Sequence, residues 1–157
     1  MLNRKNEYFE NLRKIGEDYE KARKVHEEKK LEIIENCGWD SDELKAWYDV
    51  KANMEYPIPS GACKAYRAFQ NTIEKGEDEI FMNDFLWDRE VKDFIEALRA
   101  AGFTTFIYTN QSTAMMENLH GFEAEGCRME GLCKIKRMER RFGENREEEI
   151  LGVWFSL

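Results

Sequence analysis

The fold is decided by residues 79–121, which read EIFMNDFLWDREVKDFIEALRAAGFTTFIYTNQSTAMMENLHG. Residues 80–85 have apolar side chains at both odd and even positions, as expected of a strand buried on both faces. A helical pattern follows, and residues 103–109 are again rich in the aromatic and β-branched side chains that favour strands. Two such strands joined by one helix should run parallel. The stretch therefore predicts a β-α-β-α unit at the core of an α/β domain.

A hairpin is predicted after this unit. Residues 127–140 and 147–157 have extended patterns, and residues 142–145 connect them. Side chains alternate along a strand, so the first strand has two faces. One face would carry Cys127, Met129, Cys133 and Ile135, and the other Arg128, Glu130, Lys134 and Lys136. The predicted fold class is α/β: a four-stranded mixed sheet, with two parallel strands and a C-terminal antiparallel hairpin, flanked by helices.

The chain before this domain has a helical pattern of its own. Residues 3–36 contain no proline, and a short second helix is expected to end near residue 52. Pro57 and Pro59, the two prolines of the chain, interrupt the pattern and mark the best domain boundary. We therefore expect a helical extension over residues 1–56 and an α/β domain over residues 57–157.

Apolar residues along the long helix recur at alternating steps of four and three. They are Tyr8, Leu12, Ile15, Tyr19, Ala22, His26 and Ile33, with Lys29 in one position of the series. Such a heptad seam packs along another helix. Two interpretations stay open: the helix lies along its own domain, or it is an arm that binds a partner through Tyr8, Leu12, Ile15 and Tyr19. The second interpretation includes a homodimer through this helix.

The composition is that of a highly charged, water-soluble protein. Hydrophobic residues make up 42% of the chain and charged residues 36%, and the formal net charge is −8. An acidic total argues against a dedicated duplex-DNA binder, because affinity for phosphate comes from concentrated lysine and arginine. The start of the chain is charged and no apolar run approaches transmembrane length. We therefore expect a cytoplasmic protein without a membrane partner.

The four cysteines contain no C-x-x-C pair, and the chain has only two histidines. A zinc site built from histidine and cysteine is therefore not expected. Free thiols fit a reducing compartment such as the cytoplasm. We expect no cofactor and no bound metal as the first interpretation.

Polar side chains follow both strands of the β-α-β-α unit. Asp84 and Asp88 come after the first strand, and Thr109, Asn110 and Ser112 come after the second. Ligands of open α/β sheets tend to bind beyond the carboxyl ends of the parallel strands. A helix that starts near Asn110 or Ser112 would also offer free N–H groups to an anion. One hypothesis is therefore a phosphate-directed enzyme or nucleotide binder that uses these residues, with Mg²⁺ at the aspartates.

A resemblance to haloacid-dehalogenase-type phosphohydrolases is carried by residues 88–113, DREVKDFIEALRAAGFTTFIYTNQST. In that family a Thr or Ser at the strand end, followed by Asn, binds the transferring phosphoryl group. The resemblance would give this role to Thr109. The family also has two aspartates two positions apart after its first strand. In this chain Leu86 stands two positions after Asp84, so the resemblance does not supply the catalytic pair.

A second resemblance covers the chain from about residue 62 to residue 157. The segments FMNDFLWDREVKDFIEALRAAGF, FIYTNQSTAMMENLHGF and EILGVWFSL are similar to small uncharacterised proteins of plasmids and conjugative elements in Gram-positive bacteria. That family has no known function, so it assigns no catalytic residues. Some small proteins of this genetic setting inhibit host defence systems, including CRISPR nucleases. Together with the acidic charge and the heptad seam, the resemblance leads to the hypothesis of a non-enzymatic module that binds a protein partner, with a defence nuclease as one such partner.

The predicted hairpin offers a third hypothesis. Trp154 would lie on one face with Lys134 and Lys136, and an aromatic ring beside cations can bind single-stranded nucleic acid. In the alternative, Trp154 packs under a helix and the cations protect an edge strand from aggregation. We rank the protein-interaction module first, the phosphate-directed enzyme second and the single-stranded nucleic-acid binder third.

Overall fold

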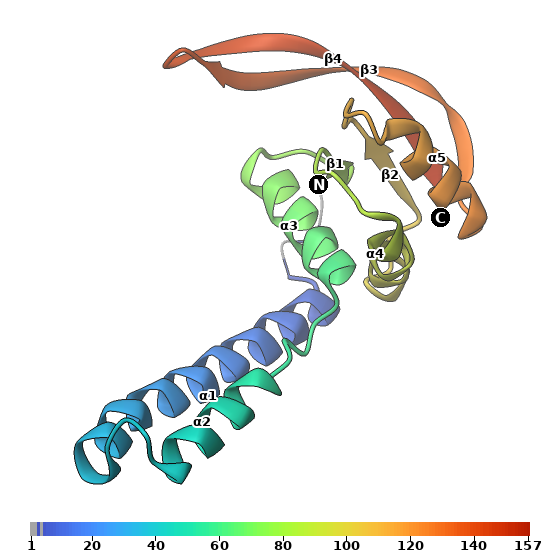
Figure 1. Cartoon of the computed structure of the whole chain (residues 1–157). Coiled ribbons are helices and arrows are strands. Elements are labelled where there is room, and N and C mark those ends of the chain that lie inside the picture. The colour runs from blue at the N-terminus through green and yellow to red at the C-terminus, as the bar shows by residue number, and fades with distance from the viewer. Residues whose placement is uncertain (1–2, 4) are drawn as a thin grey trace. The chain divides into compact units, whose positions relative to one another are not determined.

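The computed structural model describes residue 3 and residues 5–157. In chain order, its helices and strands are α1 (Glu7–Cys37), α2 (Asp42–Ala52), α3 (Ser60–Glu74), β1 (Phe81–Met82), α4 (Asp88–Ala100), β2 (Thr105–Tyr108), α5 (Met115–Ala124), β3 (Arg128–Arg141) and β4 (Glu144–Ser156) (Figure 1). They divide into two compact units. The helical unit is Phe9–Ile58, and the α/β unit is Pro59–Leu157 together with the described residues before Phe9. The division lies between Ile58 and Pro59, whereas the expected boundary lies between residues 56 and 57.

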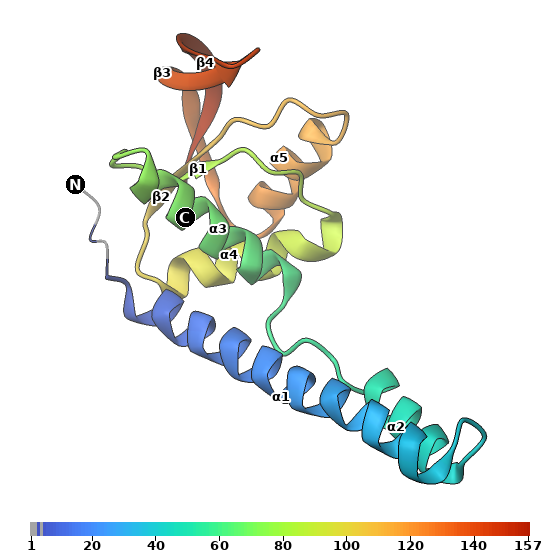
Figure 2. The ribbon, with the colours of Figure 1, turned by 90° about the vertical axis from the view of Figure 1, so that its left-hand side faces the viewer.

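In the helical unit, α2 lies beside α1 in both views (Figure 1, Figure 2). Trp47 of α2 is buried and stacks on His26 of α1, with ring centroids 4.7 Å apart. The indole N–H of Trp47 donates to the carbonyl oxygen of His26 at 2.8 Å. Lys51 of α2 also pairs with Glu27 of α1. The predicted heptad seam therefore packs, at His26, on a helix of the same chain.

The four seam residues proposed to bind a partner have different surroundings. Tyr19 donates its hydroxyl to the carbonyl oxygen of Met54 at 3.2 Å. Leu12 is half-buried, whereas Ile15 is exposed. Tyr8 belongs to the α/β unit, where burial and two nearby carboxylates of α4 raise its pKa. Binding of a partner chain through this seam stays a prediction.

The α/β unit contains one sheet with the strand order β1-β2-β4-β3. β1 and β2 are parallel, whereas β4 pairs antiparallel with both β2 and β3. The predicted α/β fold, with a four-stranded mixed sheet and a C-terminal hairpin, is confirmed. β1 is shorter than predicted, because only Phe81 and Met82 pair with β2, opposite Ile107 and Tyr108.

Aromatic side chains form the core between the sheet and its helices. Phe106 of β2 is fully buried and contacts Phe94 of α4, Phe122 of α5 and Phe155 of β4, with ring centroids 5.1–5.7 Å apart. Edge-to-face and offset contacts of this kind add to the hydrophobic effect of burial. The cluster holds α4 and α5 on the face of the sheet to which Phe106 and Phe155 point.

β3 and β4 form a hairpin whose distal half extends beyond the other two strands (Figure 1, Figure 2). The strands stay paired up to Arg141 and Glu144, so the turn consists of Phe142 and Gly143 alone. Both residues have positive φ angles, 50° and 85°, as two-residue turns of twisted hairpins require. The connection is therefore shorter than the predicted residues 142–145.

A β-bulge interrupts the pairing near the start of β3. Met129 is opposite Phe155 and Gly131 is opposite Trp154, which leaves Glu130 as the extra residue. Gly131 has a φ angle of 151°, a backbone conformation that favours glycine. Glycine at this position thus allows β3 to take one residue more than β4 over the same length.

The bulge shifts the alternation of side chains along β3 by one residue. Met129 consequently lies on the same face as Leu132 and Lys134. The prediction grouped Met129 with Cys133 and Ile135 instead, and that grouping is wrong. It assumed an unbroken alternation, whereas an extra residue reverses the faces on one side of it.

Candidate functional site

The predicted strand-end residues Thr109 and Asn110 are both hydrogen-bonded to Asn83. The hydroxyl of Thr109 donates to Asn83 Oδ1 at 3.1 Å, and Asn110 Nδ2 donates to the Asn83 carbonyl oxygen at 2.8 Å. Asn110 Oδ1 accepts the backbone N–H of Ser112. Asn83 was missed as a partner, although the parallel pairing of β1 with β2 predicts it, because the residues after Met82 and Tyr108 must be neighbours. These contacts fix the ends of the two strands to each other.

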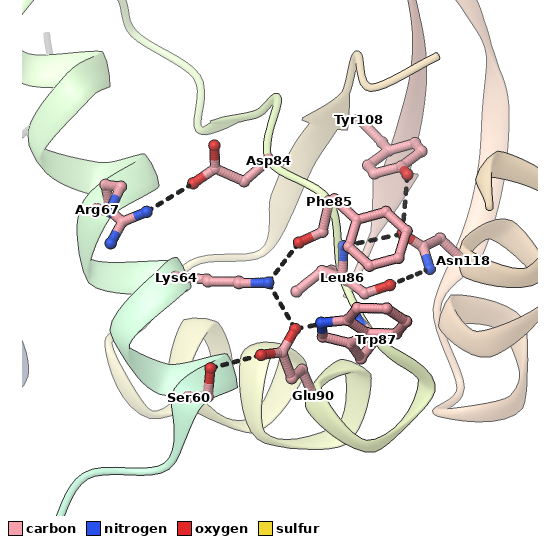
Figure 3. A network of polar contacts seen from close by, with 10 residues as sticks. All are labelled: Ser60, Lys64, Arg67, Asp84, Phe85, Leu86, Trp87, Glu90, Tyr108 and Asn118. Carbon is pink, nitrogen blue, oxygen red and sulfur yellow. Dashed lines mark hydrogen bonds and ion pairs between the residues drawn. The ribbon is translucent and has the colours of Figure 1, made fainter. Parts of the chain in front are cut away.

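The remaining strand-end residues lie in separate places. Asp84 points to Arg67, 3.5 Å away (Figure 3), and lines a hollow of about 100 Å³. Asp88 begins α4 and lines a second hollow, and Thr109 and Asn110 line a third. In the described part of the chain, Asp84, Asp88 and Thr109 thus line three different hollows, and a shared phosphate site of these residues stays a prediction.

A buried ion pair supports the strand-end loop, residues 83–87, from the side of α3. Lys64 Nζ lies 2.6 Å from Glu90 Oε2 and donates to the carbonyl oxygen of Phe85 (Figure 3). Glu90 also accepts hydrogen bonds from the Ser60 hydroxyl and from the backbone N–H of Trp87. Burial alone would raise the pKa of Glu90, but the hydrogen bonds from Lys64, Ser60 and Trp87 outweigh it and lower the pKa. Glu90 is therefore a charged structural group.

Asn118 of α5 supports the same loop from the other side. Its side chain is fully buried and bonds both backbone groups of Leu86: Oδ1 accepts the N–H at 3.3 Å, and Nδ2 donates to the carbonyl oxygen at 2.8 Å (Figure 3). The Tyr108 hydroxyl donates to the same Oδ1 at 2.9 Å. Burial raises the pKa of Tyr108 to about 12, so its hydroxyl stays a donor at neutral pH. The polar residues of this region thus hold the loop and α5 in place.

An apolar hollow of about 370 Å³ lies between α5 and the hairpin. We call it the hairpin groove and define it by its apolar lining: Met115, Leu119, Met129, Leu132, Leu151 and Val153. Thr109, Asn110 and Gln111 form the polar part of its wall. Three of the apolar side chains are largely open to water, since Leu132 is 79% exposed, Leu151 52% and Met129 50%. Contiguous exposed apolar surface of this kind is typical of binding sites.

The β-bulge brings Met129 into this groove. The extra residue in β3 puts Met129 on the face of Leu132, whose partner Val153 is two residues from Leu151 on β4. Regular alternation would have turned Met129 to the opposite face. The prediction named neither Leu132 nor the groove, and the one sequence signal for them is the glycine at position 131, since an isolated glycine in a strand often marks a bulge.

The predicted shared face of Trp154, Lys134 and Lys136 is wrong. Trp154 is opposite Gly131, whereas Lys134 is opposite Leu151, three residues before Trp154 on a regular strand. Residues an odd number apart on a strand point to opposite faces. The two lysines therefore lie on the groove face and Trp154 on the other, which removes the geometric basis of the nucleic-acid hypothesis.

Neither a metal-binding cluster nor a membrane-spanning helix is formed in the part of the chain that the structure describes. Among residue 3 and residues 5–157, no three His, Cys, Asp or Glu side chains are placed to hold a metal ion together. Burial raises the pKa of the Cys127 and Cys133 thiols, which keeps them protonated and makes them poor metal ligands. None of the described helices combines the length and the apolar character that a membrane crossing needs.

Comparison with known proteins identifies a family for most of the chain. Residues 64–157 match the family described as a domain of unknown function, DUF7698. The matched region begins within α3 and contains α4, α5, all four strands and the hairpin groove. No curated protein and no solved structure matches the chain. The chain therefore belongs to the DUF7698 family of domains of unknown function.

Proposed function

We propose that this protein is a non-enzymatic protein-interaction module whose partner binds in the hairpin groove. The supporting observation is that Met129, Leu132 and Leu151 expose half or more of their surface while lining one concave hollow. Single exposed apolar residues are ordinary on protein surfaces, but several in a concave site are not. Covering them with a partner would remove this apolar surface from water.

The free energy gained by burying these three side chains shows whether the partner needs further contacts. Fully burying a leucine or methionine side chain contributes about 1.5–3 kcal/mol. Because the three side chains are already partly covered, their burial contributes roughly 3–5 kcal/mol in total. Association itself costs about 4 kcal/mol or more in lost freedom of motion. A stable complex therefore needs polar contacts beside the apolar ones.

The groove is preformed. Asn118 and Phe122 hold α5, the first by its hydrogen bonds to Leu86 and Tyr108 and the second in the aromatic core. Phe155 holds the base of β4 in the same core. A site whose walls are fixed before binding avoids the entropic cost of ordering them. This rigidity favours specific recognition of one partner shape.

The polar side chains at the groove and around the strand-end loop are engaged in structural contacts, which favours binding over catalysis. The hydroxyl of Thr109 and the amide of Asn110 are hydrogen-bonded to Asn83, and Lys64 and Glu90 neutralise each other inside the unit. Groups engaged in this way hold the protein together and are poor candidates for a reaction on a substrate. The groove itself is a concave, mostly apolar surface that a partner can fill.

The first partner to test is the one that the resemblance to proteins of conjugative elements implies, a host defence nuclease. The net charge of −8 fits docking on the basic surface of a nucleic-acid enzyme by parts of the chain other than β3, which is itself basic. The assay is DNA cleavage by a purified defence nuclease with and without the full chain. Inhibition that the groove variant Leu132→Asp, Leu151→Asp loses would identify that nuclease as the partner.

The proposed function itself is tested without knowing the partner. Random peptides displayed on phage are selected on the immobilised full chain, and the affinities of the selected peptides are measured for the wild type and for Leu132→Asp, Leu151→Asp. We expect the groove variant to bind the selected peptides at least about tenfold more weakly, because charged side chains replace the apolar lining.

A matched control is Phe142→Asp at the hairpin turn. Phe142 is fully exposed and lies outside the groove, so this variant also exchanges an exposed apolar side chain for a charge. It should bind the selected peptides like the wild type. Selected peptides that bind the groove variant and the wild type equally would refute the proposed function.

A further inference from the structure

The hairpin groove continues into an open edge of the sheet. The strand order places β3 at one end, and among the described residues the backbone of β3 pairs only with β4. We propose that the partner presents an acidic, extended segment that adds to β3 as a further strand. This inference rests on the proposed function, because the same segment would cover the groove.

The two edges of the sheet differ in what they offer. β1, at the other edge, consists of Phe81 and Met82, which is too short to hold an added strand by its backbone. β3 runs from Arg128 to Arg141 and so presents a long row of backbone groups on its open side. Strand addition to such an edge supplies the polar contacts that the groove alone lacks.

The charge of β3 identifies the chemistry of the added segment. The strand reads RMEGLCKIKRMERR, with six basic and two acidic residues. Several of these cations are neutralised within the protein, since Arg137 pairs with Glu77 and Arg141 with Glu148. Lys136 and Arg140 make no ion pair with any side chain in the part of the chain that the structure describes.

These two cations lie on the groove face. Lys136 and Arg140 are four and eight residues after Leu132 on β3. Because side chains alternate along a strand, all three lie on one face. The groove face of β3 thus changes along the strand, from apolar side chains near the bulge to cations near the turn. An added strand places its side chains directly beside those of β3. It therefore needs apolar side chains at one end and carboxylates at the other.

A second copy of the chain fits this edge poorly. A two-fold antiparallel pairing of β3 centred on Lys136 would place the two Lys136 side chains opposite each other. A pairing centred on Met138 would place Lys136 opposite Arg140. Like charges directly opposite each other destabilise a strand pair. These registers disfavour a second copy, and the cations without an ion pair favour an acidic segment of a different protein.

The test uses the tightest peptide from the selection described above, made in four synthetic forms. The first is unchanged, and in the second every Asp and Glu is replaced by Asn and Gln. The third and fourth are N-methylated on the backbone at one or the other set of alternate residues. An added edge strand uses only one set of alternate N–H groups toward β3. Binding to the full chain is measured by fluorescence anisotropy.

We expect neutralisation of the carboxylates to weaken binding about tenfold, and one N-methylated form to weaken it by at least about tenfold while the other binds like the parent. In the protein, Lys136→Glu, Arg140→Glu should weaken binding of the unchanged peptide about tenfold. The matched charge change Lys21→Glu, Lys24→Glu, at two exposed positions of α1, should leave it unchanged.

The outcomes separate this inference from the proposed function. If the peptide loses affinity for Leu132→Asp, Leu151→Asp but tolerates both N-methylated sets, the groove is a binding site and strand addition is wrong. If the neutral peptide binds as well as the acidic one, the proposed acidic chemistry is wrong. If no selected peptide depends on Leu132 and Leu151, the proposed function fails first.

Discussion

The strand-end loop and the hairpin groove belong to the same unit but differ in what they expose. The loop is supported by buried polar side chains, whereas the groove exposes apolar ones. Around the loop, Lys64, Glu90 and Asn118 are largely withdrawn from water and hydrogen-bonded on several sides. In the groove, Leu132 and Leu151 face water without a cover. A satisfied buried network stabilises one conformation, whereas an open apolar hollow gains free energy only when something binds. We therefore attribute stability to the loop and propose recognition for the groove.

The largest expected loss of stability comes from removing the side chain of Asn118, which supports the strand-end loop. Asn118→Ala leaves the N–H and carbonyl of Leu86 and the hydroxyl of Tyr108 without their partner in a buried place. Each unsatisfied group costs about 1 kcal/mol or more, so we expect the free energy of unfolding to fall by roughly 3 kcal/mol. Urea denaturation followed by circular dichroism measures the change.

The control for this variant is Asn145→Ala, an exposed asparagine of β4. Its free energy of unfolding should stay within about 0.5 kcal/mol of the wild type. Should Asn118→Ala prove as mild as Asn145→Ala, the buried amide is not what holds the loop to α5.

A smaller loss is expected when the buried ion pair is broken. Glu90→Gln keeps the shape of the side chain but leaves the Lys64 ammonium, 18% exposed, without its counter-charge. We expect a loss of about 2 kcal/mol at neutral pH, below the range for fully buried pairs because Lys64 keeps some contact with water. Glu96→Gln, which affects an exposed pair with Lys92, should cost less than about 0.5 kcal/mol. Equal losses for the two variants would contradict a special role of Glu90.

The lowered pKa of Glu90 adds a pH dependence to this pair. A carboxyl whose pKa is lower in the folded state than in the unfolded state stabilises the fold above its ordinary pKa, about 4.3. That contribution is lost as the pH falls through the lowered pKa, because Glu90 then becomes protonated in the folded state too. The stability gap between wild type and Glu90→Gln should therefore narrow in acid. Urea denaturation at a series of pH values tests this, and a gap independent of pH would contradict it.

The hydrophobic pattern predicted the sheet because strands that are buried on both faces have apolar side chains at consecutive positions. Phe106 and its neighbours in residues 103–109 are apolar for that reason, and Phe106 is indeed at the centre of the core. The contact of Asn83 with Thr109 could also have been predicted, since parallel strands bring their ends together. Local pattern and strand register are therefore enough for the scaffold.

The groove and the buried network could not be predicted in the same way. Lys64 and Glu90 are far apart in the chain, and nothing in a single sequence pairs one charged residue with another among so many. The face of Met129 depended on one extra residue at Glu130, and a bulge is decided by backbone geometry rather than by periodicity. Sequence reasoning was consequently weakest where an irregularity brings a residue into the candidate site.

The smallest expected loss of stability comes from replacing the exposed leucines of the hairpin groove. Leu132→Ser, Leu151→Ser removes apolar side chains that are already more than half exposed, so the free energy of unfolding should change by less than about 1 kcal/mol. Val153→Ser, on the same face of β4 but buried, should cost roughly 2 kcal/mol. Urea denaturation and peptide affinity are measured together. A binding surface predicts that the leucine variant loses affinity and keeps its stability. If the leucine variant instead unfolds as readily as Val153→Ser, those leucines are part of the core, and their exposure does not mark a binding site.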